Sequence, residues 1–515
     1  MNFTFSHYAS KDWSLALLLL VCLYLGLFTG IHSDDYSNAW FWSKNQLDFS
    51  NIDTKHWGYL PWYVLHSYIF KYLKFSPSGY ELIRIVFNFI TVAMLGKFFE
   101  KYASKPTALI LSFLIIFYPL HDSTTYWFTG SYITHTCFYL FLGAYLIQNE
   151  KFWSGTLIVL FASFFSYSSV PMAAGLMVLF FLEKKWKQLA FFATPHFLYV
   201  LYFLTLPGDK KGTGQFVSNK LLSLLKSLVL QAGTYLDTNF GPSFLFKLTS
   251  SILSLSFLSF ILAISTIVFL NYYYKKKQLS LSFNIPLFCA LGTMTLASLG
   301  VYALTGRYPQ IAFGLGNRVT FFTSFLVSYL FLWLALKNRV LFGLISSIFV
   351  LSIFGLSDHW KKWNITQTEI ISNIASNDDF QEMKAGDYFF VKQNLYSDLG
   401  GFAHIQFFAE DIGSLIIRLA RNLDDGPTVY PMARRFQVRG DKVKDVKYGD
   451  SFNLKESIPI YDSKTNKFSL IPSSQLQNEI DTQPLLKRHW AQMCKGTFIE
   501  KIIVRISPRL AYIFN

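Results

Sequence analysis

The sequence has few charged residues and few cysteines. Asp, Glu, Lys and Arg make up 15% of its 515 residues, whereas 52% are hydrophobic and 54 are phenylalanine. The mean hydropathy is +0.32. A chain of this composition is too apolar for a soluble globule and too long for a single domain. The composition therefore predicts a protein that crosses a membrane several times.

Four cysteines are too few for the disulfide framework of a small secreted protein. Cys22, Cys137 and Cys289 lie within apolar runs, and Cys494 is the only cysteine in the polar C-terminal part. That part therefore has no disulfide of its own. No cysteine or histidine spacing resembles a zinc site, and the chain contains no internal repeat or low-complexity tract.

The formal net charge of +15 would by itself suggest a nucleic-acid-binding protein. Residues 358–515, however, contain 21 Lys and Arg against 19 Asp and Glu, so nearly all of the excess lies in the apolar part. Short cytoplasmic loops of membrane proteins collect such cations. No basic face remains to bind a polyanion, and nucleic acid is excluded as a partner.

About eleven apolar runs are predicted to span the membrane. The first, from Trp13 to Ile31, is a retained signal anchor because ten further spans follow it. Between residues 152 and 182 the motif "SYSSVP", which contains Pro171, predicts a hairpin between two short spans. The other runs are long enough to cross about 30 Å of hydrocarbon; they cover residues 81–98, 106–120, 131–147, 188–206, 243–270, 283–304, 319–336 and 340–356.

The basic loops support this count. If the N-terminus is cytoplasmic, the inside loops are "KFFEKYASK", "QNEK", "EKKWK", "NYYYKKKQ" and "KNR", and each is short and basic. The outside then receives "HSDDY", residues 121–132, residues 305–318 and the whole C-terminal part. Every polar feature of interest is thus predicted on one face of the membrane.

Three further segments are predicted to lie flat in the outer membrane interface: residues 34–47, 57–73 and 220–236. Segment 57–73 carries Pro61 and Lys71 and is rimmed by tryptophan and tyrosine, which suit an interface better than a membrane interior. Counting it as a span would place the later basic loops outside. For segment 34–47, "SDD" is the predicted helix N-cap.

We therefore predict two domains. Residues 1–357 form a transmembrane domain, with outward interfacial helices at about 34–80. Residues 358–515 form a soluble extracytoplasmic domain, because hydropathy falls there and turn motifs such as "LDDGPT" recur. The predicted fold class is an α-helical polytopic membrane protein with a C-terminal α+β domain.

This order of features resembles the C-type superfamily of glycosyltransferases: one transmembrane helix, an acidic pair in the first outward loop, two interfacial helices, further spans and an outward terminal domain. Members take a sugar from a polyprenyl-phosphate carrier. The resemblance covers nearly all of residues 1–357. It implies an inverting hexosyl- or pentosyltransferase of the bacterial inner membrane, with a periplasmic C-terminal domain, similar to enzymes that decorate O-antigen or other surface glycans. The implied partners are a polyprenyl-phosphate sugar donor, a glycan or lipid-linked acceptor and the lipid bilayer.

The chemistry of such a transfer gives independent reasons to single out certain residues. A base must deprotonate the acceptor hydroxyl, and a carboxylate at the partly dehydrated membrane rim suits this role. Asp34 and Asp35 are the catalytic candidates, with Asp34 preferred as the base. The leaving lipid phosphate gains negative charge, which arginine neutralises well. Arg307 and Arg318, both in the outward loop 305–318, are the candidates for binding the donor phosphate.

Asp122, beside His121, is a further candidate by analogy with the superfamily. The pair would orient the acceptor or hold a metal together with Asp34 and Asp35. The sequence does not require a cofactor, because some superfamily members use a divalent cation such as Mg²⁺ or Mn²⁺ and others use none.

Each candidate also has a purely structural interpretation. The acidic pair can simply cap a helix, Arg318 can extend to lipid headgroups, and "HDS" at 121–123 can form a turn. The tryptophans from 57 to 62 suit an interfacial anchor or a sugar-stacking platform. His359 and His404 suggest only ordinary surface or core positions.

Other functions also stay open at this stage. A polysaccharide polymerase would act on the same lipid-linked substrates, although its large outward loop normally falls in the middle of the chain. A flippase or exporter needs polar residues along its spans, and charged residues are nearly absent there. A non-catalytic scaffold would tolerate replacement of Asp34.

Overall fold

The computed structural model describes most of the chain. The described residues are 14–44, 58–206, 221–276, 278–305, 310–392, 396–400, 402–408, 410–445, 451–483 and 494–506, together with 508 and 511. Arg307 lies outside these residues, as do Trp57 and the last residues of the predicted segment 34–47.

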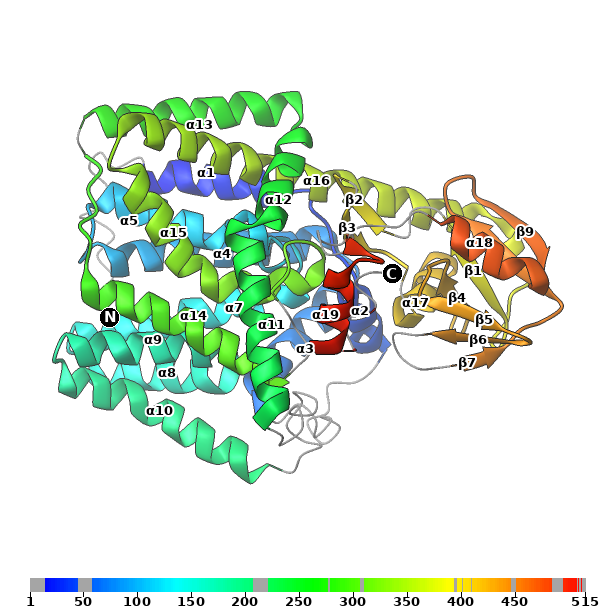
Figure 1. Cartoon of the computed structure of the whole chain (residues 1–515), viewed down its shortest axis with the longest axis horizontal. Coiled ribbons are helices and arrows are strands. Elements are labelled where there is room, and N and C mark those ends of the chain that lie inside the picture. Colours follow the sequence, from blue (N-terminus) through cyan, green and yellow to red (C-terminus); the bar gives the residue numbers. More distant parts are fainter. Residues whose placement is uncertain are drawn as a thin grey trace.

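The larger part of the molecule is a bundle of helices that run in broadly the same direction (Figure 1). They are α1 (Ser14–Gly26), α4 (Pro77–Phe99), α5 (Lys105–Ile116), α7 (Tyr132–Gln148), α8 (Phe152–Phe165), α9 (Ser169–Leu182), α10 (Trp186–Thr205), α13 (Phe257–Lys275), α14 (Ile285–Thr305), α15 (Phe321–Ala335) and α16 (Arg339–Ser376). Within the described residues, six helices are long and apolar enough to cross a membrane: α4, α10, α13, α14, α16, and α15 with the turn before it. The protein is therefore a helical membrane protein.

The predicted break between two short spans is confirmed. α8 ends at Phe165 and α9 begins at Ser169, and the chain turns between them. Pro171 lies in the first turn of α9, where a missing backbone N–H leaves no intrahelical hydrogen bond unmade.

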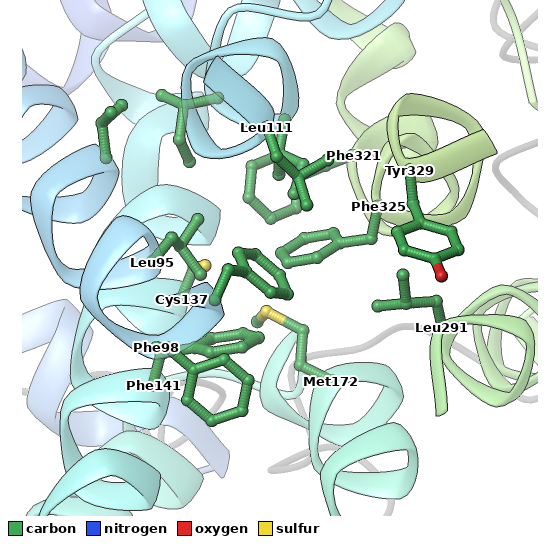
Figure 2. Close-up of a cluster of buried hydrophobic side chains, with 14 of the residues drawn as sticks. Leu95, Phe98, Leu111, Cys137, Phe141, Met172, Leu291, Phe321, Phe325 and Tyr329 are labelled. Carbon is green, nitrogen blue, oxygen red and sulfur yellow. The ribbon is translucent and has the colours of Figure 1, made fainter. Parts of the chain in front are cut away.

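Aromatic side chains fill much of the space between the helices (Figure 2). The rings of Phe98 and Phe141 meet edge to face with centroids 5.0 Å apart, and the ring of Phe141 stacks on that of Phe325 at 5.6 Å. These residues come from α4, α7 and α15, so one series of ring contacts joins three helices. The high phenylalanine content of the chain thus serves the packing of the bundle.

The loops with basic residues meet at one end of the bundle. Ala103, in the loop after α4, forms an isolated β-bridge with Leu281, in the loop after α13. Tyr102 donates a 2.7 Å hydrogen bond to Glu183, in the loop after α9, and Lys101 forms an ion pair with the same carboxylate. Three of the loops predicted to share a side of the membrane therefore lie together.

The opposite end of the bundle is covered by helices that lie across it or beside its rim (Figure 1). They are α2 (Asp34–Lys44), α3 (Leu60–Leu73), α11 (Leu221–Phe240) and α12 (Pro242–Leu253). α2, α3 and α11 coincide with the three predicted interfacial segments, so the helices predicted there are confirmed.

The prediction of a single span over residues 243–270 is wrong. The chain forms two helices there, α12 and α13, and they run in different directions (Figure 1). Ser256 ends the break by capping α13, because its side chain accepts a hydrogen bond from Ser259 N. α12 also packs closely on α16, since a Cβ at Gly355 would lie 1.8 Å from the carbonyl oxygen of Ser251.

The predicted boundary between residues 357 and 358 falls inside a helix. α16 runs without interruption from Arg339 to Ser376, from the bundle into the C-terminal part (Figure 1). A shared helix, and not a flexible linker, thus joins the two parts of the molecule.

The C-terminal part is a small α+β domain, as predicted. Its elements are β1 (Tyr388–Lys392), β2 (Tyr396–Leu399), β3 (Phe402–Gln406), α17 (Glu410–Arg421), β4 (Thr428–Pro431), β5 (Phe436–Arg439), β6 (Lys442–Asp445), β7 (Ser451–Asn453), β8 (Ser457–Asp462), β9 (Lys467–Pro472) and α18 (Leu476–Thr482). The last helix, α19 (Phe498–Ile506), lies apart from the sheets and beside α11 (Figure 1). The main sheet has the order β4-β1-β8-β9, in which β1 is parallel to β4 and β8, and β9 is antiparallel to β8. β5, β6 and β7 form a second, antiparallel sheet, and β2 and β3 form a hairpin.

This domain contacts α2, the helix that begins with the acidic pair. Asp424 forms a 3.1 Å ion pair with Lys44, in the last turn of α2. The guanidinium of Arg418, from α17, lies 4.7 Å from the centroid of the Trp40 ring. α2 is therefore held between the end of the bundle and the C-terminal domain.

Candidate functional site

The two carboxylates of the acidic pair have different surroundings although they are neighbours in the sequence. α2 begins at Asp34, which is exposed, whereas Asp35 is fully buried. Ser33 precedes the helix with a φ of 49°, and its hydroxyl donates a 3.4 Å hydrogen bond to Asp34. The sharp turn at Ser33 directs one carboxylate outward and the other inward.

The Asp35 carboxylate accepts hydrogen bonds from four donors. Oδ2 accepts from His32 N at 3.0 Å and from Phe128 N at 3.3 Å. Oδ1 accepts from Thr129 N at 2.8 Å and from Thr129 Oγ1 at 2.6 Å. Burial raises the pKa of Asp35 to about 6, although these hydrogen bonds and the charge of Arg84 act in the opposite direction. Asp35 thus ties the start of α2 to the turn that contains Phe128 and Thr129.

Two buried charged residues of α4 hold the segment before α2. Arg84 Nη2 donates to Thr29 Oγ1 at 2.9 Å and to the Gly30 carbonyl at 2.8 Å, and Glu81 accepts from Gly30 N at 2.7 Å. A Cβ at Gly30 would lie 1.9 Å from Asn364 Oδ1, so only glycine fits there. The sequence-based prediction did not single out Glu81 and Arg84. Their signal in the sequence was two charged residues, three positions apart, at the end of a predicted span.

Arg318 lies close to the same turn. Its guanidinium carbon is 5.0 Å from the centroid of the Trp127 ring, within range of a cation–π interaction. The side chain is partly buried, and its charge also acts on Tyr167, in the turn between α8 and α9. Arg318 therefore faces the protein at the end of the bundle opposite the basic loops.

Residues 127–129, called here the 127–129 turn, connect two groups that were predicted separately. The backbone N–H groups of Phe128 and Thr129 bind Asp35, and the ring of Trp127 supports Arg318. The acidic pair and the arginine come from loops almost three hundred residues apart in the sequence, and the fold brings both to one turn.

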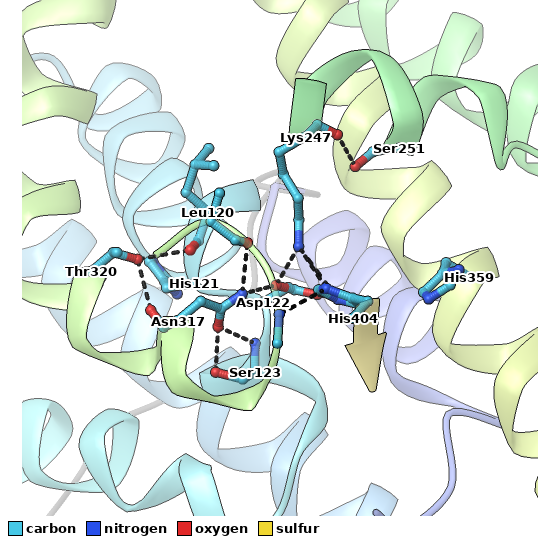
Figure 3. A network of polar contacts seen from close by, with 12 residues as sticks. Leu120, His121, Asp122, Ser123, Lys247, Ser251, Asn317, Thr320, His359 and His404 are labelled. Carbon is cyan, nitrogen blue, oxygen red and sulfur yellow. Dashed lines mark hydrogen bonds and ion pairs between the residues drawn. The ribbon is translucent and has the colours of Figure 1, made fainter. Parts of the chain in front are cut away.

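Asp122 is the centre of a second, fully buried network (Figure 3). Its Oδ1 accepts from Lys247 Nζ at 3.1 Å and from Asn317 Nδ2 at 2.6 Å. Its Oδ2 accepts from His404 Nε2 at 2.6 Å and from Trp360 Nε1 at 2.7 Å. Asp122 itself precedes the short helix α6 (Ser123–Tyr126). The four donors come from α12, the turn before α15, α16 and β3, so this one carboxylate joins five separate segments.

The charges of this network favour a structural junction. Burial alone would raise the pKa of Asp122, but His404 and Lys247 outweigh it and hold that pKa well below its ordinary value. Burial lowers the pKa of Lys247 to about 8, against the attraction of Asp122. At neutral pH the carboxylate is therefore ionised and faces a cation, and protein donors occupy both of its oxygens.

His121 has other hydrogen-bond partners than its neighbour Asp122. Its Nδ1 is 2.8 Å from Thr124 Oγ1, its Nε2 is 2.8 Å from the Ile115 carbonyl, and the ring points away from Asp122 (Figure 3). The side chains of these two adjacent residues therefore take part in different sets of hydrogen bonds.

The predicted metal set of Asp34, Asp35 and Asp122 is not assembled. Asp35 and Asp122 each accept four hydrogen bonds from different partners, so neither presents an open carboxylate to a cation. Within the described residues, no three His, Cys, Asp or Glu side chains are grouped so that they could hold a metal ion. This set does not fit a divalent cation, and no step below is assigned to one.

His404 and Lys247 are the residues of this network that the prediction missed. His404 occupies a core position, one of the two positions expected of it, and its ring is buried between Asp122, Lys247 and Trp360. Lys247 did leave a signal, since it is a lone cation inside an apolar run. His404 left none, because all of its partners are remote in the sequence.

Trp62 is turned toward the bundle. Its ring lies 5.7 Å from that of Tyr132, in α7, and 4.7 Å from that of His66, one turn later in α3. Trp62 therefore packs against protein side chains. A tryptophan that served only as a lipid-facing anchor would not need these contacts.

No protein-family model, no curated protein and no solved structure matches this chain. The assignment of a function therefore depends on the residues and their geometry.

Proposed function

We propose that this protein is an inverting glycosyltransferase, similar to the C-type superfamily. It transfers a sugar from a polyprenyl-phosphate donor to a glycan or lipid-linked acceptor at the outer face of the bacterial inner membrane. The observation that carries this proposal is the 127–129 turn, which binds Asp35 through its backbone and supports Arg318 through the Trp127 ring. If Asp35 only capped a helix, the turn that it binds would not need a guanidinium beside it. Transfer of a sugar from a lipid phosphate, in contrast, needs a base and a cation in one region.

The proposed topology has about eleven spans and a cytoplasmic N-terminus. Two observations support it: the loops after α4, α9 and α13 meet at one end of the bundle, and both polar networks lie at the other end. The positive-inside rule then places the basic end in the cytoplasm, and the candidate site and the C-terminal domain in the periplasm.

Within this proposal Asp34 is the base, because its carboxylate is the exposed one of the pair. It takes the proton of the acceptor hydroxyl while the oxygen attacks the anomeric carbon. The bond between that carbon and the phosphate oxygen breaks, and its electron pair leaves with the polyprenyl phosphate. Arg318 faces the growing negative charge on the phosphate. Asp35 positions Asp34 by fixing the first turn of α2.

The test is glycosyl transfer by the purified protein in nanodiscs with a panel of polyprenyl-phosphate sugars, each with and without EDTA. Asp34→Asn should lower kcat by about 10²–10⁴-fold, the usual contribution of a general base, while donor binding is retained. Glu369→Gln, at another exposed carboxylate toward the outward end of α16, is the matched control and should keep full activity.

The two aspartates should also differ from each other. Asp35→Asn should lower both activity and thermal stability, because it disturbs four buried hydrogen bonds, whereas Asp34→Asn should leave stability unchanged. Normal turnover by Asp34→Asn on an accepted donor would overturn the assignment of the base. Failure of the wild-type protein to use any donor of the panel would count against the function itself.

A further inference from the structure

A deep apolar groove lies between α1, α5, α13, α15 and α16 and has a volume of about 550 Å³. Ligand pockets of proteins typically measure about 300–1,000 Å³. Its walls include Leu17, Leu20, Leu109, Phe269, Phe342 and Val350. Leu20 and Phe269 are also exposed, so the groove opens sideways between α1 and α13.

The groove extends over one half of the membrane thickness. On α1 its lining runs from Ser14 to Tyr24, and ten residues of α-helix rise about 15 Å. The hydrocarbon core of a bilayer is about 30 Å thick, so one leaflet accounts for roughly this length. The lining begins at the end of the bundle that carries the basic loops, where Pro106 and Phe342 also contribute to it.

The other end of the groove is closed. The hydroxyl groups of Tyr24 and Ser259 lie 2.7 Å apart and join α1 to α13. Lys361 covers the Tyr24 ring at 4.0 Å and donates to the Tyr24 carbonyl at 2.7 Å. A chain inside the groove therefore enters from the basic end or from the side, and not from the end that holds the candidate site.

Three hydroxyl side chains of the interior form their hydrogen bonds within their own helices. Ser265, Thr266 and Ser346 line the groove, and each donates to a backbone carbonyl four residues earlier in its own helix. Such a surface is complementary to hydrocarbon and offers nothing to a polar ligand.

Three cations lie at the ends of two helices that line the groove. Lys275 and Lys276 form the exposed end of α13, and Arg339 is the exposed first residue of α16. The rings of Tyr274 and Phe342 stack at 4.8 Å, which brings these two helix ends together beside the groove. Basic clusters between helices at this side of a membrane bind anionic lipid headgroups.

We propose that the groove binds one acyl chain of an anionic phospholipid from the leaflet on the basic-loop side, with its headgroup at Lys275, Lys276 and Arg339. The length, the closed far end and the three cations at the ends of α13 and α16 favour this occupant over a lipid that enters from the opposite leaflet. The site does not depend on the proposed enzymatic activity.

The test is native mass spectrometry of the purified protein after exchange into phosphatidylglycerol or phosphatidylcholine. The wild-type protein should retain one phosphatidylglycerol, at least tenfold more strongly than phosphatidylcholine. The triple variant Lys275→Gln, Lys276→Gln, Arg339→Gln should lose this preference. Each charge removed should lower the retention of phosphatidylglycerol by about fivefold. The triple variant Lys151→Gln, Lys184→Gln, Lys187→Gln, at exposed lysines of other loops with basic residues, is the matched control and should keep it.

Two substitutions that fill the groove test the acyl-chain part of the site. Ser346→Phe and Thr266→Phe each place a ring inside the groove and should abolish lipid retention. The test needs only one of the two variants to be folded. Equal retention of both lipids by the wild-type protein would overturn the headgroup site. Retention of phosphatidylglycerol by a folded Phe variant would overturn the groove as the binding site.

Discussion

His404 Nε2 donates a 2.6 Å hydrogen bond to Asp122 Oδ2 across 282 positions of the sequence. The bond joins β3 of the C-terminal domain to the loop between α5 and α7, and both residues are almost completely inaccessible to solvent. The C-terminal domain also contacts α2, which carries the acidic pair. The domain is therefore part of the same folded unit as the candidate site, and its attachment affects the geometry of that site.

Asp122→Asn should strongly destabilise the protein. The substitution leaves Lys247 and His404 buried without their counter-charge, and breaking a buried pair in this way typically costs about 3–5 kcal/mol. Thermal unfolding in detergent measures the effect. Asp424→Asn removes an ion pair of the C-terminal domain with Lys44, in which the Asp424 side chain is almost fully exposed, and should leave the melting temperature unchanged. Equal stability of Asp122→Asn and wild type would show that the network is not a junction.

Asp35 should make the stability of the protein depend on pH. Its folded pKa of about 6 lies above the ordinary value of 3.8, so the folded state binds the proton more tightly than the unfolded state. This stabilisation is complete below about pH 4 and is lost as the pH rises through 6, an amount of roughly 3 kcal/mol. The melting temperature of the wild type should therefore fall between pH 4 and 7 relative to that of Asp35→Asn. Parallel pH profiles would contradict the raised pKa.

Arg318→Lys distinguishes a phosphate ligand from a residue that merely extends to lipid headgroups. Lysine keeps the charge but loses the planar fork that binds a phosphate through two N–H groups. We expect kcat/KM for the donor to fall by about 10²-fold, as when one donor to a developing anion is removed. Trp127→Phe keeps an aromatic face beneath the arginine and should stay close to wild type. Full activity of Arg318→Lys would support the headgroup interpretation.

Gly355→Ala tests the close contact of α12 with α16. The new Cβ would lie 1.8 Å from the backbone oxygen of Ser251, and such overpacking typically costs about 1–3 kcal/mol. Gly343→Ala is a control on the same helix, because its nearest neighbour would be Asn271 Oδ1 at 3.8 Å. Thermal unfolding should show a lower melting temperature for Gly355→Ala alone.

Local patterns in the sequence predicted much of the fold. The motif around Pro171 and the turn-rich region after residue 358 depend on neighbouring residues, and the structure agrees with both. Among the hydrophobic runs, six helices of the described residues are long and apolar enough to cross a membrane. The run 243–270 failed for a physical reason. Hydropathy does not distinguish a helix along the membrane normal from one across the bundle end, and here packing against Gly355 decides the direction of α12.

The site was predicted less completely. The resemblance and the chemistry of the transfer selected Asp34, Asp35, Arg307 and Arg318, and the fold places Asp35 and Arg318 at one turn. The sequence could not show which of the two carboxylates, Asp34 or Asp35, is exposed, because the two neighbours share one local sequence. His404 was missed altogether, since its role arises from contacts with remote segments.

The sequence by itself determined that the chain is a helical membrane protein and that its C-terminal part is α+β, because these properties follow from composition and short-range periodicity. Only the tertiary structure decided that Asp35 is buried and Asp34 exposed, that Asp122 is a junction, and that α16 joins the two domains. Burial and ion pairing arise between segments that the sequence separates by up to several hundred residues, and no local pattern contains that information.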